Sequence, residues 1–573
     1  MLARTPIPSK RSILADVMIM LSIAAVIYAS FLFATEWDAK FNPSYDIDLS
    51  LQTLPLYALF SALRGLGAYF ISLIFTMIVG YWAAKSPQAE KIILPLLDVL
   101  QSIPVLGFLP GLVLGLVALF PKTNIGLELA AIVMIFTGQV WNMTFAFYSS
   151  LKSVPGDLQE AASVMGLSKS VRFLRLELPF SAVNLVWNSI MSMAGGWFFL
   201  TVCEAFTLGE TQYRLPGLGA YMAVAIEKND IEAMVAGVVA MALVIISLDL
   251  LIWRPALAWV HRYRLESATP GVAEDHLLRF IFSHSSALRF VRHLLVKRQQ
   301  KRLLKNQTRS WKLPISFTFE FPKAQSKIIY LMAAALVIAA VGFGTFKLFK
   351  TLAELKLSQW LLILEGTLFT SLRVFGTLII ATAWALPAGI WLSRGEKRLR
   401  WAQPIAQLLA SFPAPMLYPL VLTLTFGVGL HFSWSSMLLM LLGVQWYVLF
   451  NSLAGGLRIS REIEDSLSLM GNSKKDKWRY LYIPSVFPSL VTGWVTAAGG
   501  AWNASIVAEY LSYRGQTIQT HGLGALISVS AEKADFAMLS ACLVVMVVVV
   551  VLLNRYVWDR IYKISQTRFR LDF

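Results

Sequence analysis

Two glutamates, Glu204 and Glu509, lie late in long apolar segments and are 305 residues apart. Ionisable side chains in such segments are usually buried and paired, or line a water-filled path. Two interpretations follow: the glutamates are gate or pathway residues near an outer mouth, or they cap a helix end or pair with Arg214 or Arg514. Carboxylates along a path would repel anions, which favours a gating or structural role over direct contact with an anionic solute.

The same segments carry paired tryptophans and arginines. Trp197 and Trp502 precede the glutamates by about two helical turns. Either they pack in a core, or they stack against a solute. Arg64 and Arg373 recur in two further apolar segments, where we expect buried pairing with an acidic partner.

Other chemistry is excluded by the residues that the sequence lacks. It contains no G-x-x-x-x-G-K-[ST] phosphate loop, so the chain is not expected to hydrolyse ATP itself. Cys203 and Cys542 lie in separate apolar segments, which argues against a disulfide framework or a cysteine metal site. Four histidines in residues 261–293 fit no zinc spacing. The sequence therefore predicts no catalytic residues, no metal and no cofactor, and the isolated carboxylates do not form the constellation that an intramembrane enzyme needs.

Composition indicates a polytopic membrane protein. Of 573 residues, 57% are hydrophobic and only 14% are charged, with a mean hydropathy of +0.63. The net charge of +17 is concentrated in residues 254–326, which hold 14 Lys and Arg against 4 Asp and Glu. That distribution is typical of membrane topology and lipid contact rather than of nucleic-acid binding.

Apolar runs of about 20 residues predict twelve membrane spans. They lie near 14–35, 57–84, 92–120, 126–150, 181–207, 232–253, 328–350, 360–392, 402–430, 434–457, 485–511 and 537–556. Placing the N-terminus in the cytoplasm puts the basic loops and the C-terminus there as well, as the positive-inside rule requires. The first run resembles a signal peptide, but an equivalent run precedes the second half, where cleavage would make no sense.

The chain is predicted to contain two copies of one unit. An offset of 305 residues pairs Trp141 with Trp446 and Gly166 with Gly471. Nearer the start of each copy, an offset of 309 residues pairs Arg64 with Arg373. Six spans per copy make the repeats parallel, related by an axis along the membrane normal, with a pore or binding site on that axis. We therefore predict an all-α fold with a first domain at 1–253, a basic cytoplasmic linker at 254–327 and a second domain at 328–573.

A charged stretch interrupts each copy. In "EAASVMGLSKSVRFLRLELP" (160–179) an amphipathic helix stops at Gly166, and Ser168 begins a basic helix. In "DSLSLMGNSKKDKWRYLYIP" (465–484), Ser473 and Asp476 resemble a capping box. Each unit can either dock in a groove of a partner protein or lie on the bilayer surface.

The first stretch resembles the E-A-A-x-x-x-G loop of ABC-importer permeases, which docks into the ATPase subunit. "VAEY" (507–510), "SLR" (371–373), "SIP" (102–104) and "SFP" (411–413) look like the branch that handles nitrate, sulfonates, taurine and bicarbonate. In the second copy Asp-Ser-Leu replaces Glu-Ala-Ala, so the two contacts with the ATPase can differ. The resemblance implies that the residues coupling the chain to the ATPase are Glu160, Ala161, Ala162, Gly166, Asp465, Ser466, Leu467 and Gly471.

The resemblance implies a fused permease subunit in a bacterial inner membrane. Two ATP-binding cassette subunits and an extracytoplasmic solute-binding protein would be its partners, and a small anionic solute would pass by alternating access. The alternative is a stand-alone secondary transporter with twelve spans. That class predicts a basic, glycine-rich loop between spans two and three, where the sequence has "KSPQAEK" (85–91).

Overall fold

The computed structural model describes residues 30–260 and 342–568, apart from positions 103, 514 and 515, together with Tyr28, Ala335 and Ala339. The described chain is almost entirely helical. The elements of the first half are α2 (Leu54–Phe75), η1 (Thr76–Gly80), α3 (Tyr81–Lys85), α4 (Pro87–Ser102), η2 (Val105–Phe108), α5 (Leu109–Leu119), α6 (Ile125–Lys152), α7 (Gly156–Val164), α8 (Lys169–Arg172), η3 (Phe173–Glu177), α9 (Leu178–Cys203), β1 (Ala205–Leu208), β2 (Thr211–Arg214), α10 (Leu218–Glu227), α11 (Ile231–Leu248), η4 (Asp249–Trp253) and α12 (Arg254–Val260).

The second half repeats this order, with the single helix α16 in place of α2, η1 and α3 and with no counterpart of η2. Its elements are α16 (Leu357–Ser393), α17 (Glu396–Ser411), α18 (Ala414–Gly427), α19 (Phe432–Leu457), α20 (Arg461–Leu469), α21 (Lys474–Lys477), η6 (Trp478–Tyr482), α22 (Ile483–Ala508), β3 (Tyr510–Tyr513), β4 (Gln516–Gln519), α23 (Leu523–Glu532), α24 (Phe536–Leu553), η7 (Asn554–Trp558) and α25 (Asp559–Arg568). The repeat read from the sequence is thus present in the structure, down to the π-helical turns that precede α9 and α22.

The described residues contain eight helices that are long and apolar enough to cross a membrane, or nine if one bent pair counts as a span. This confirms an all-α polytopic membrane protein. The predicted first and seventh spans (14–35 and 328–350) lie largely outside the described residues. Helix α12 continues to Val260, beyond the predicted start of the linker. The predicted domain boundaries otherwise stay predictions, and most of the linker is not described.

The third predicted span of each half is not one straight helix. In the second half α17 and α18 are bent by 93° at the break between them. In the first half α4 ends at Ser102, and η2 and α5 follow Pro104. Pro104 and Pro413 are extended, with ψ near 110°, and proline disfavours helix at the residue before it. The two prolines therefore break a segment that its hydropathy alone predicts to be continuous.

Two β-hairpins follow α9 and α22, and the sequence did not predict them. Strand β1 pairs antiparallel with β2, and β3 with β4. The predicted spans to residues 207 and 511 therefore end earlier, at Cys203 and Ala508. Gly209 has φ +60 in the β1–β2 turn, a conformation that glycine adopts without steric cost.

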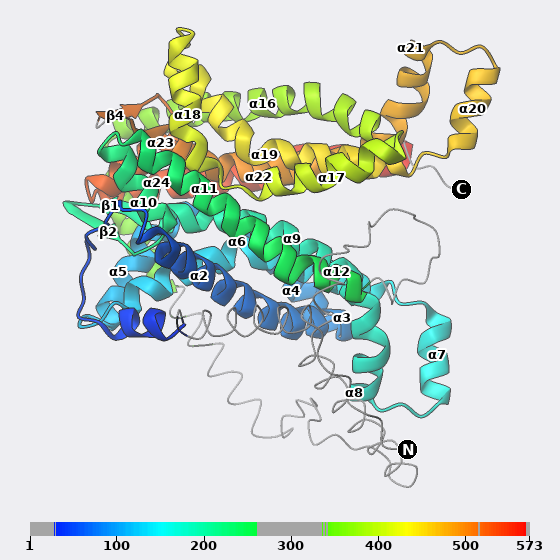
Figure 1. The fold of residues 1–573 in the computed structure, drawn as a ribbon, viewed down its shortest axis with the longest axis horizontal. Coiled ribbons are helices and arrows are strands. Elements are labelled where there is room, and N and C mark those ends of the chain that lie inside the picture. Colours follow the sequence, from blue (N-terminus) through cyan, green and yellow to red (C-terminus); the bar gives the residue numbers. More distant parts are fainter. Residues whose placement is uncertain are drawn as a thin grey trace, which may run out of the picture.

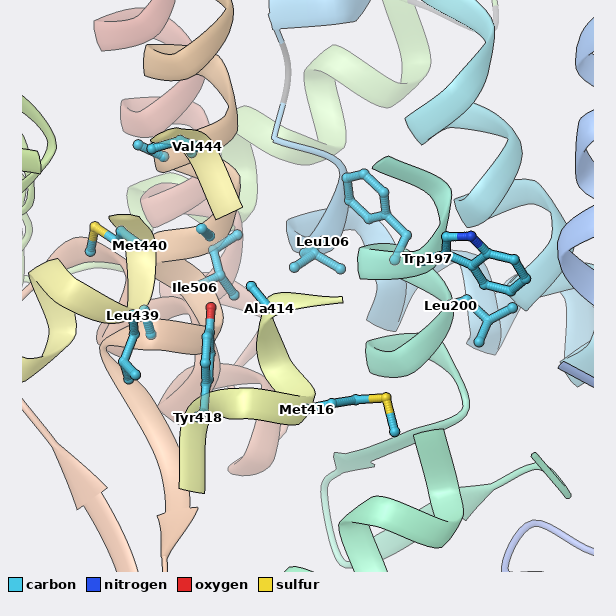
Figure 2. Close-up of a cluster of buried hydrophobic side chains, with 14 of the residues drawn as sticks. Leu106, Trp197, Leu200, Ala414, Met416, Tyr418, Leu439, Met440, Val444 and Ile506 are labelled. Carbon is cyan, nitrogen blue, oxygen red and sulfur yellow. The ribbon is translucent and has the colours of Figure 1, made fainter. Parts of the chain in front are cut away.

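The two halves interlock rather than lying side by side. Segment η2 contacts α22, and Val105 donates its backbone N–H to the Asn503 side chain at 2.8 Å. Conversely, α17 and α18 pack on α9. Figure 2 shows Met416 of α18 pointing toward α9, which carries Trp197 and Leu200, within one apolar core built from both halves.

The functional elements are divided between the two ends of the molecule. Helices α7 and α8 of the first half lie at the same end as α20 and α21 of the second, while the hairpins and α10 and α23 lie at the opposite end (Figure 1). We call these the coupling end and the hairpin end. The halves meet at the hairpin end, where Gly209 donates its N–H to the Ala531 carbonyl at 3.2 Å.

Candidate functional site

At the hairpin end of the first half, Arg64 lies between two carboxylates. Its Nε is 2.7 Å from Glu128 Oε2, its Nη2 donates to Glu128 Oε1 at 2.8 Å, and its Nη1 donates to Glu204 Oε1. All three side chains are buried. The three side chains come from α2, α6 and the end of α9, so their ion pairs connect these helices. Separating the helices would leave a buried charge without a partner, which is costly.

Glu204 also holds the start of α10. The Gly219 N–H donates to its Oε2 at 2.7 Å, and Ser61 donates to both carboxylate oxygens at 2.7 and 3.0 Å. A Cβ on Gly217 would lie 2.4 Å from the carboxylate, so glycine is needed there for close approach. The buried Glu204 carboxylate therefore explains the "GLG" sequence at 217–219: it accepts a hydrogen bond from the Gly219 backbone and leaves no room for a side chain at Gly217.

The second half builds the same arrangement with one carboxylate fewer. Arg373 Nη1 is 2.8 Å from Glu509 Oε1, and Thr370 and the Gly524 N–H also donate to Glu509. Arg373 Nη2 donates to Thr520 Oγ1 at 2.9 Å, and Thr520 is in turn 2.7 Å from the hydroxyl of Ser433. The offset of 305 places Ser433 where the first half has Glu128.

The expected pairing of Arg64 and Arg373 with acidic partners is thus observed. The alternative partner considered for Glu204 is not, because Arg214 pairs with Glu227 at 2.6 Å. Arg514 is outside the described residues. A role for Glu204 and Glu509 as gate or pathway residues stays a prediction, and their contacts are those of groups that fix the hairpin end.

Trp197 and Trp502 are both 2% exposed and lie in the apolar core. Neither is among the described residues that line the cavity described next. Their position fits the packing interpretation, and a contact with solute stays a prediction.

A cavity of about 400 Å³ lies between the halves. It is lined by α4, α6 and α9 of the first half and by α17, α19 and α22 of the second, and it contains repeat-related pairs such as Trp141 with Trp446 and Gly195 with Gly500. Its place between the two halves fits the axial site that parallel repeats predict, and its use by a solute stays a prediction. Its volume falls in the range of small-molecule sites, roughly 300–1,000 Å³.

At the coupling end, α7 carries the predicted first coupling residues. Glu160, Ala161 and Gly166 are exposed, whereas Ala162 is 5% exposed and faces the protein. Gly166 has φ +64, and the Leu167 N–H returns to the Ala162 carbonyl at 3.1 Å, which closes the helix as predicted. The apolar face of this amphipathic helix is therefore only partly accessible: Ala161 and Met165 are open to a partner, whereas Ala162 is not.

In the second half, helix α20 terminates in the same way as α7. Gly471 has φ +76, and Asp465 and Ser466 are exposed while Leu467 is half-buried. The predicted capping box is present: Asp476 donates its N–H to Ser473 Oγ, and Asp476 Oδ2 accepts the Ser473 N–H at 3.0 Å. The roles of these residues in ATPase coupling stay predictions.

Four apolar side chains lie next to the glycine turns. Met165 and Met470 belong to the predicted apolar faces of the two amphipathic helices, whereas Val164 and Leu469 were not predicted from the sequence. Val164 and Met165 are 88% and 73% exposed, and Leu469 and Met470 are 90% and 76% exposed. They are related by the offset of 305, and that recurrence beside a helix-ending glycine was the signal available. Large apolar side chains exposed at the tip of a polar loop indicate a protein or membrane contact.

The two coupling helices are attached differently. Glu464 of α20 pairs with Arg394 at 3.0 Å and accepts a hydrogen bond from Tyr482. At the equivalent position α7 has Gln159, which donates only to the Val154 carbonyl at 3.0 Å. Helix α20 is therefore held by an ion pair to Arg394, directly after α16, and by a hydrogen bond to Tyr482 of η6. Within the described residues α7 has no equivalent ion pair at Gln159.

With this geometry established, the comparison with known families is specific. The family model of the binding-protein-dependent transport system inner membrane component matches twice, at residues 76–253 and 381–571. The two matches cover more than half of the chain and one falls in each repeat. The chain belongs to this family of transport permeases.

Individual relatives are distant but consistent with it. The chain is 24% identical to a putative ABC transporter permease of Methanocaldococcus jannaschii, over 35% of this chain and 73% of that protein. It is 24% identical to the glycine betaine transport system permease of Bacillus subtilis and 23% identical to the taurine transport system permease of Escherichia coli, over 35% and 32% of this chain. The chain spans 64% and 62% of those two proteins, and together they do not confine it to the nitrate and sulfonate branch.

Proposed function

We propose that the chain is the transmembrane permease subunit of an ATP-driven importer, with two permease domains fused in one polypeptide. Two ATPase subunits would dock at the coupling end, one on α7 and one on α20. An extracytoplasmic binding protein would dock at the hairpin end. The family match supports this proposal over a stand-alone secondary transporter, because the family model is that of a binding-protein-dependent system.

The observation that carries the proposal is the pair of glycine-ended helices at one end of the molecule (Figure 1). Each presents exposed apolar residues at its tip and acidic residues along one side. The docking face we propose combines the predicted residues Glu160, Ala161, Gly166, Asp465, Ser466 and Gly471 with the exposed Val164, Met165, Leu469 and Met470. Movement of these helices by the ATPases would rock the halves about the central cavity.

We further propose that the coupling end and both termini are cytoplasmic in a bacterial inner membrane. The basic loops of the sequence support this orientation. The domains would be residues 1–253 and 328–573, joined by the basic linker at 254–327.

For the solute, the resemblance to one branch of the ABC-importer permeases implies a small anion of the nitrate, sulfonate, taurine or bicarbonate kind. The names of two relatives, a taurine and a glycine betaine permease, add solutes that carry both a positive nitrogen and an acidic group. We therefore propose a small charged solute at the central cavity.

The test is reconstitution of the full chain with its ATPase. The purified chain alone should hydrolyse no ATP, and co-expression should give a stable complex that does. Gly166→Asp should abolish complex formation or reduce coupled hydrolysis at least tenfold, because it places a charged side chain at a positive φ in the docking face. Gly156→Asp is the matched control, since Gly156 also has open space around it but no positive φ. Unchanged coupling in Gly166→Asp would contradict the proposal.

A further inference from the structure

At the coupling end of the first half, one carboxylate joins three elements. Glu177, the last residue of η3, directly precedes α9, and its Oε1 accepts from Lys85 Nζ at 2.7 Å and from Arg172 Nε at 3.1 Å. Lys85 ends α3 and Arg172 ends α8. Glu177 is 1% exposed, so these two cations, rather than water, stabilise its charge. We call this contact the first junction, and we call α7 with α8, and α20 with α21, the coupling loops.

The second half has a junction that connects the corresponding elements. Glu464 of α20 pairs with Arg394 at 3.0 Å and accepts a hydrogen bond from the Tyr482 hydroxyl. The repeat places Arg394 at the position of Lys85, with an offset of 309, and Tyr482 at that of Glu177, with an offset of 305. In each half, therefore, one carboxylate connects a coupling loop to the end of one long helix and to the residue that directly precedes another.

The two junctions make these connections with different residues. Arg172 supplies the contact of the coupling loop in the first half, whereas its repeat counterpart Lys477 donates to Ser468 of α20. In the second half the contact comes from Glu464, whose first-half counterpart is Gln159. An ion pair that served only local stability would not need to join the same three elements in both copies. The recurrence indicates that the connection itself is required.

The helices that start at the junctions line the central cavity. Helix α9 begins directly after Glu177 and contributes Trp187 and Phe198 to the lining, and α22 begins directly after Tyr482 and contributes Asn503. A π-helical turn precedes each of them, and such turns are frequent at functional sites. Each junction therefore lies between a coupling loop and a helix of the cavity wall.

We propose that Glu177 and Glu464 are positioning residues for transport: through them, movement of each coupling loop shifts α9 or α22 at the cavity. This rests on the proposed function, since it identifies how the coupling end acts on the cavity. Neither residue is among the described residues that line the cavity, so each acts through a helix rather than on the solute. Loss of either carboxylate should separate ATP hydrolysis from the response of the cavity rather than abolish both.

The test uses the complex of the full chain with its ATPase subunits and binding protein in lipid nanodiscs. Ala454 lines the cavity and is exposed, and the native Cys203 and Cys542 are buried, so Ala454→Cys places an accessible thiol in the cavity. A hydrophilic methanethiosulfonate reagent modifies this thiol, and its rate is compared without nucleotide and with ATP and vanadate. ATP hydrolysis is measured on the same sample.

Glu177→Gln should reduce the ATP-dependent change in the modification rate by at least about fivefold, while hydrolysis stays within about twofold of the parent. The variant should still fold, because Lys85 and Arg172 are 28% and 27% exposed and water can solvate them. Glu464→Gln should act in the same direction but less strongly, because Arg394 keeps two backbone carbonyls as acceptors.

Glu90→Gln is the matched control. Glu90 also accepts from a lysine and a tyrosine at the coupling end, but it joins α4 to α6 outside the junction, so neither the rate change nor hydrolysis should alter. An unchanged cavity response in Glu177→Gln, an equal loss of response and hydrolysis in that variant, or the same loss of response in Glu90→Gln would each overturn the proposal while leaving the proposed function standing. A parent complex that does not hydrolyse ATP, or whose cavity does not respond to it, would contradict the proposed function and this inference with it.

Discussion

In the first half of the molecule Arg64 lies between two buried carboxylates, whereas in the second half Arg373 has one carboxylate and a chain of two hydroxyls. The scaffold around them is the same, with a hydroxyl at position 61 or 370 and a G-L-G turn at each α10-type helix. The comparison shows that both arginines donate from Nη1 and Nη2 to partners in their own half, but that the fold does not require a particular net charge at this place. It tolerates a difference of one negative charge between equivalent sites.

At the coupling end the two halves also differ in their ion pairs, and here it is the second half that has an ion pair on its coupling helix. In the first half Glu90 ties α4 to α6 through Tyr148 and Lys152, at 2.5 and 2.7 Å. In the second half the equivalent positions are Leu399, Leu453 and Leu457, and the ionic contact instead holds α20 itself through Glu464. Two copies of one fold thus keep the same helices in place but anchor their coupling helices with different strength.

The largest effect should come from breaking the buried arginine clusters. Arg64→Met leaves Glu128 and Glu204 buried without their counter-ion, which should cost about 3–5 kcal/mol. Arg373→Met should cost less, because only Glu509 loses its partner and it keeps the Thr370 hydroxyl and backbone donors. Apparent melting temperatures of the purified chain, followed by fluorescence-detected size exclusion, measure both. A greater loss in Arg373→Met would contradict the comparison.

Glu128→Gln sharpens the same comparison. It gives the first half the net charge of the second while leaving the ion pair of Arg64 with Glu204. We expect a loss of about 1–2 kcal/mol, the scale of a weakened charged hydrogen bond. The same melting assay measures it. A destabilisation as large as that of Arg64→Met would mean that Glu128, and not Glu204, is the necessary partner.

At the coupling end, Glu464→Gln should loosen α20 without affecting α7. The variant removes the ion pair with Arg394, which is largely shielded from water. Hydrogen exchange of the α20 amides should become about tenfold faster, corresponding to about 1.4 kcal/mol. Gln159→Ala is the control in α7, where we expect little change because its side chain bonds only to a nearby carbonyl. Equal loosening of both helices would remove the proposed asymmetry.

The smallest effect concerns Glu90 and depends on pH. The hydrogen bonds from Lys152 and Tyr148 hold the pKa of Glu90 below its ordinary value of 4.5. A carboxyl with a lowered folded-state pKa contributes stability above its unfolded pKa and loses it as pH falls through the folded one. Glu90→Gln should therefore melt slightly lower than the parent at pH 7, and the difference should shrink below pH 4.5. A difference that is constant with pH would show that the ionised carboxylate contributes nothing.

The sequence predicted those features that local patterns determine. The glycine ends of α7 and α20 and the cap at Ser473 follow from residues within a few positions of one another. The repeat follows from identical residues at a constant offset along the chain. The partner of Glu204 did not, because Arg64 is 140 positions away and Arg214 is nearer in sequence. Hydropathy also missed the breaks at Pro104 and Pro413, since an apolar run has the same composition whether it is straight or bent. Exposure of Met165 and Met470 depends on how far the helices project, which no local pattern encodes.

The central claim is that both coupling helices contact ATPase subunits, and cross-linking tests it most directly. The native Cys203 and Cys542 are buried, so Met165→Cys and Met470→Cys introduce the reactive thiols. In a complex that hydrolyses ATP, the account predicts that each variant cross-links to an ATPase subunit. Cysteine at Leu511 of the hairpin end, the control position, should not. An active complex in which neither coupling helix cross-links, or in which the hairpin end does, would contradict the account.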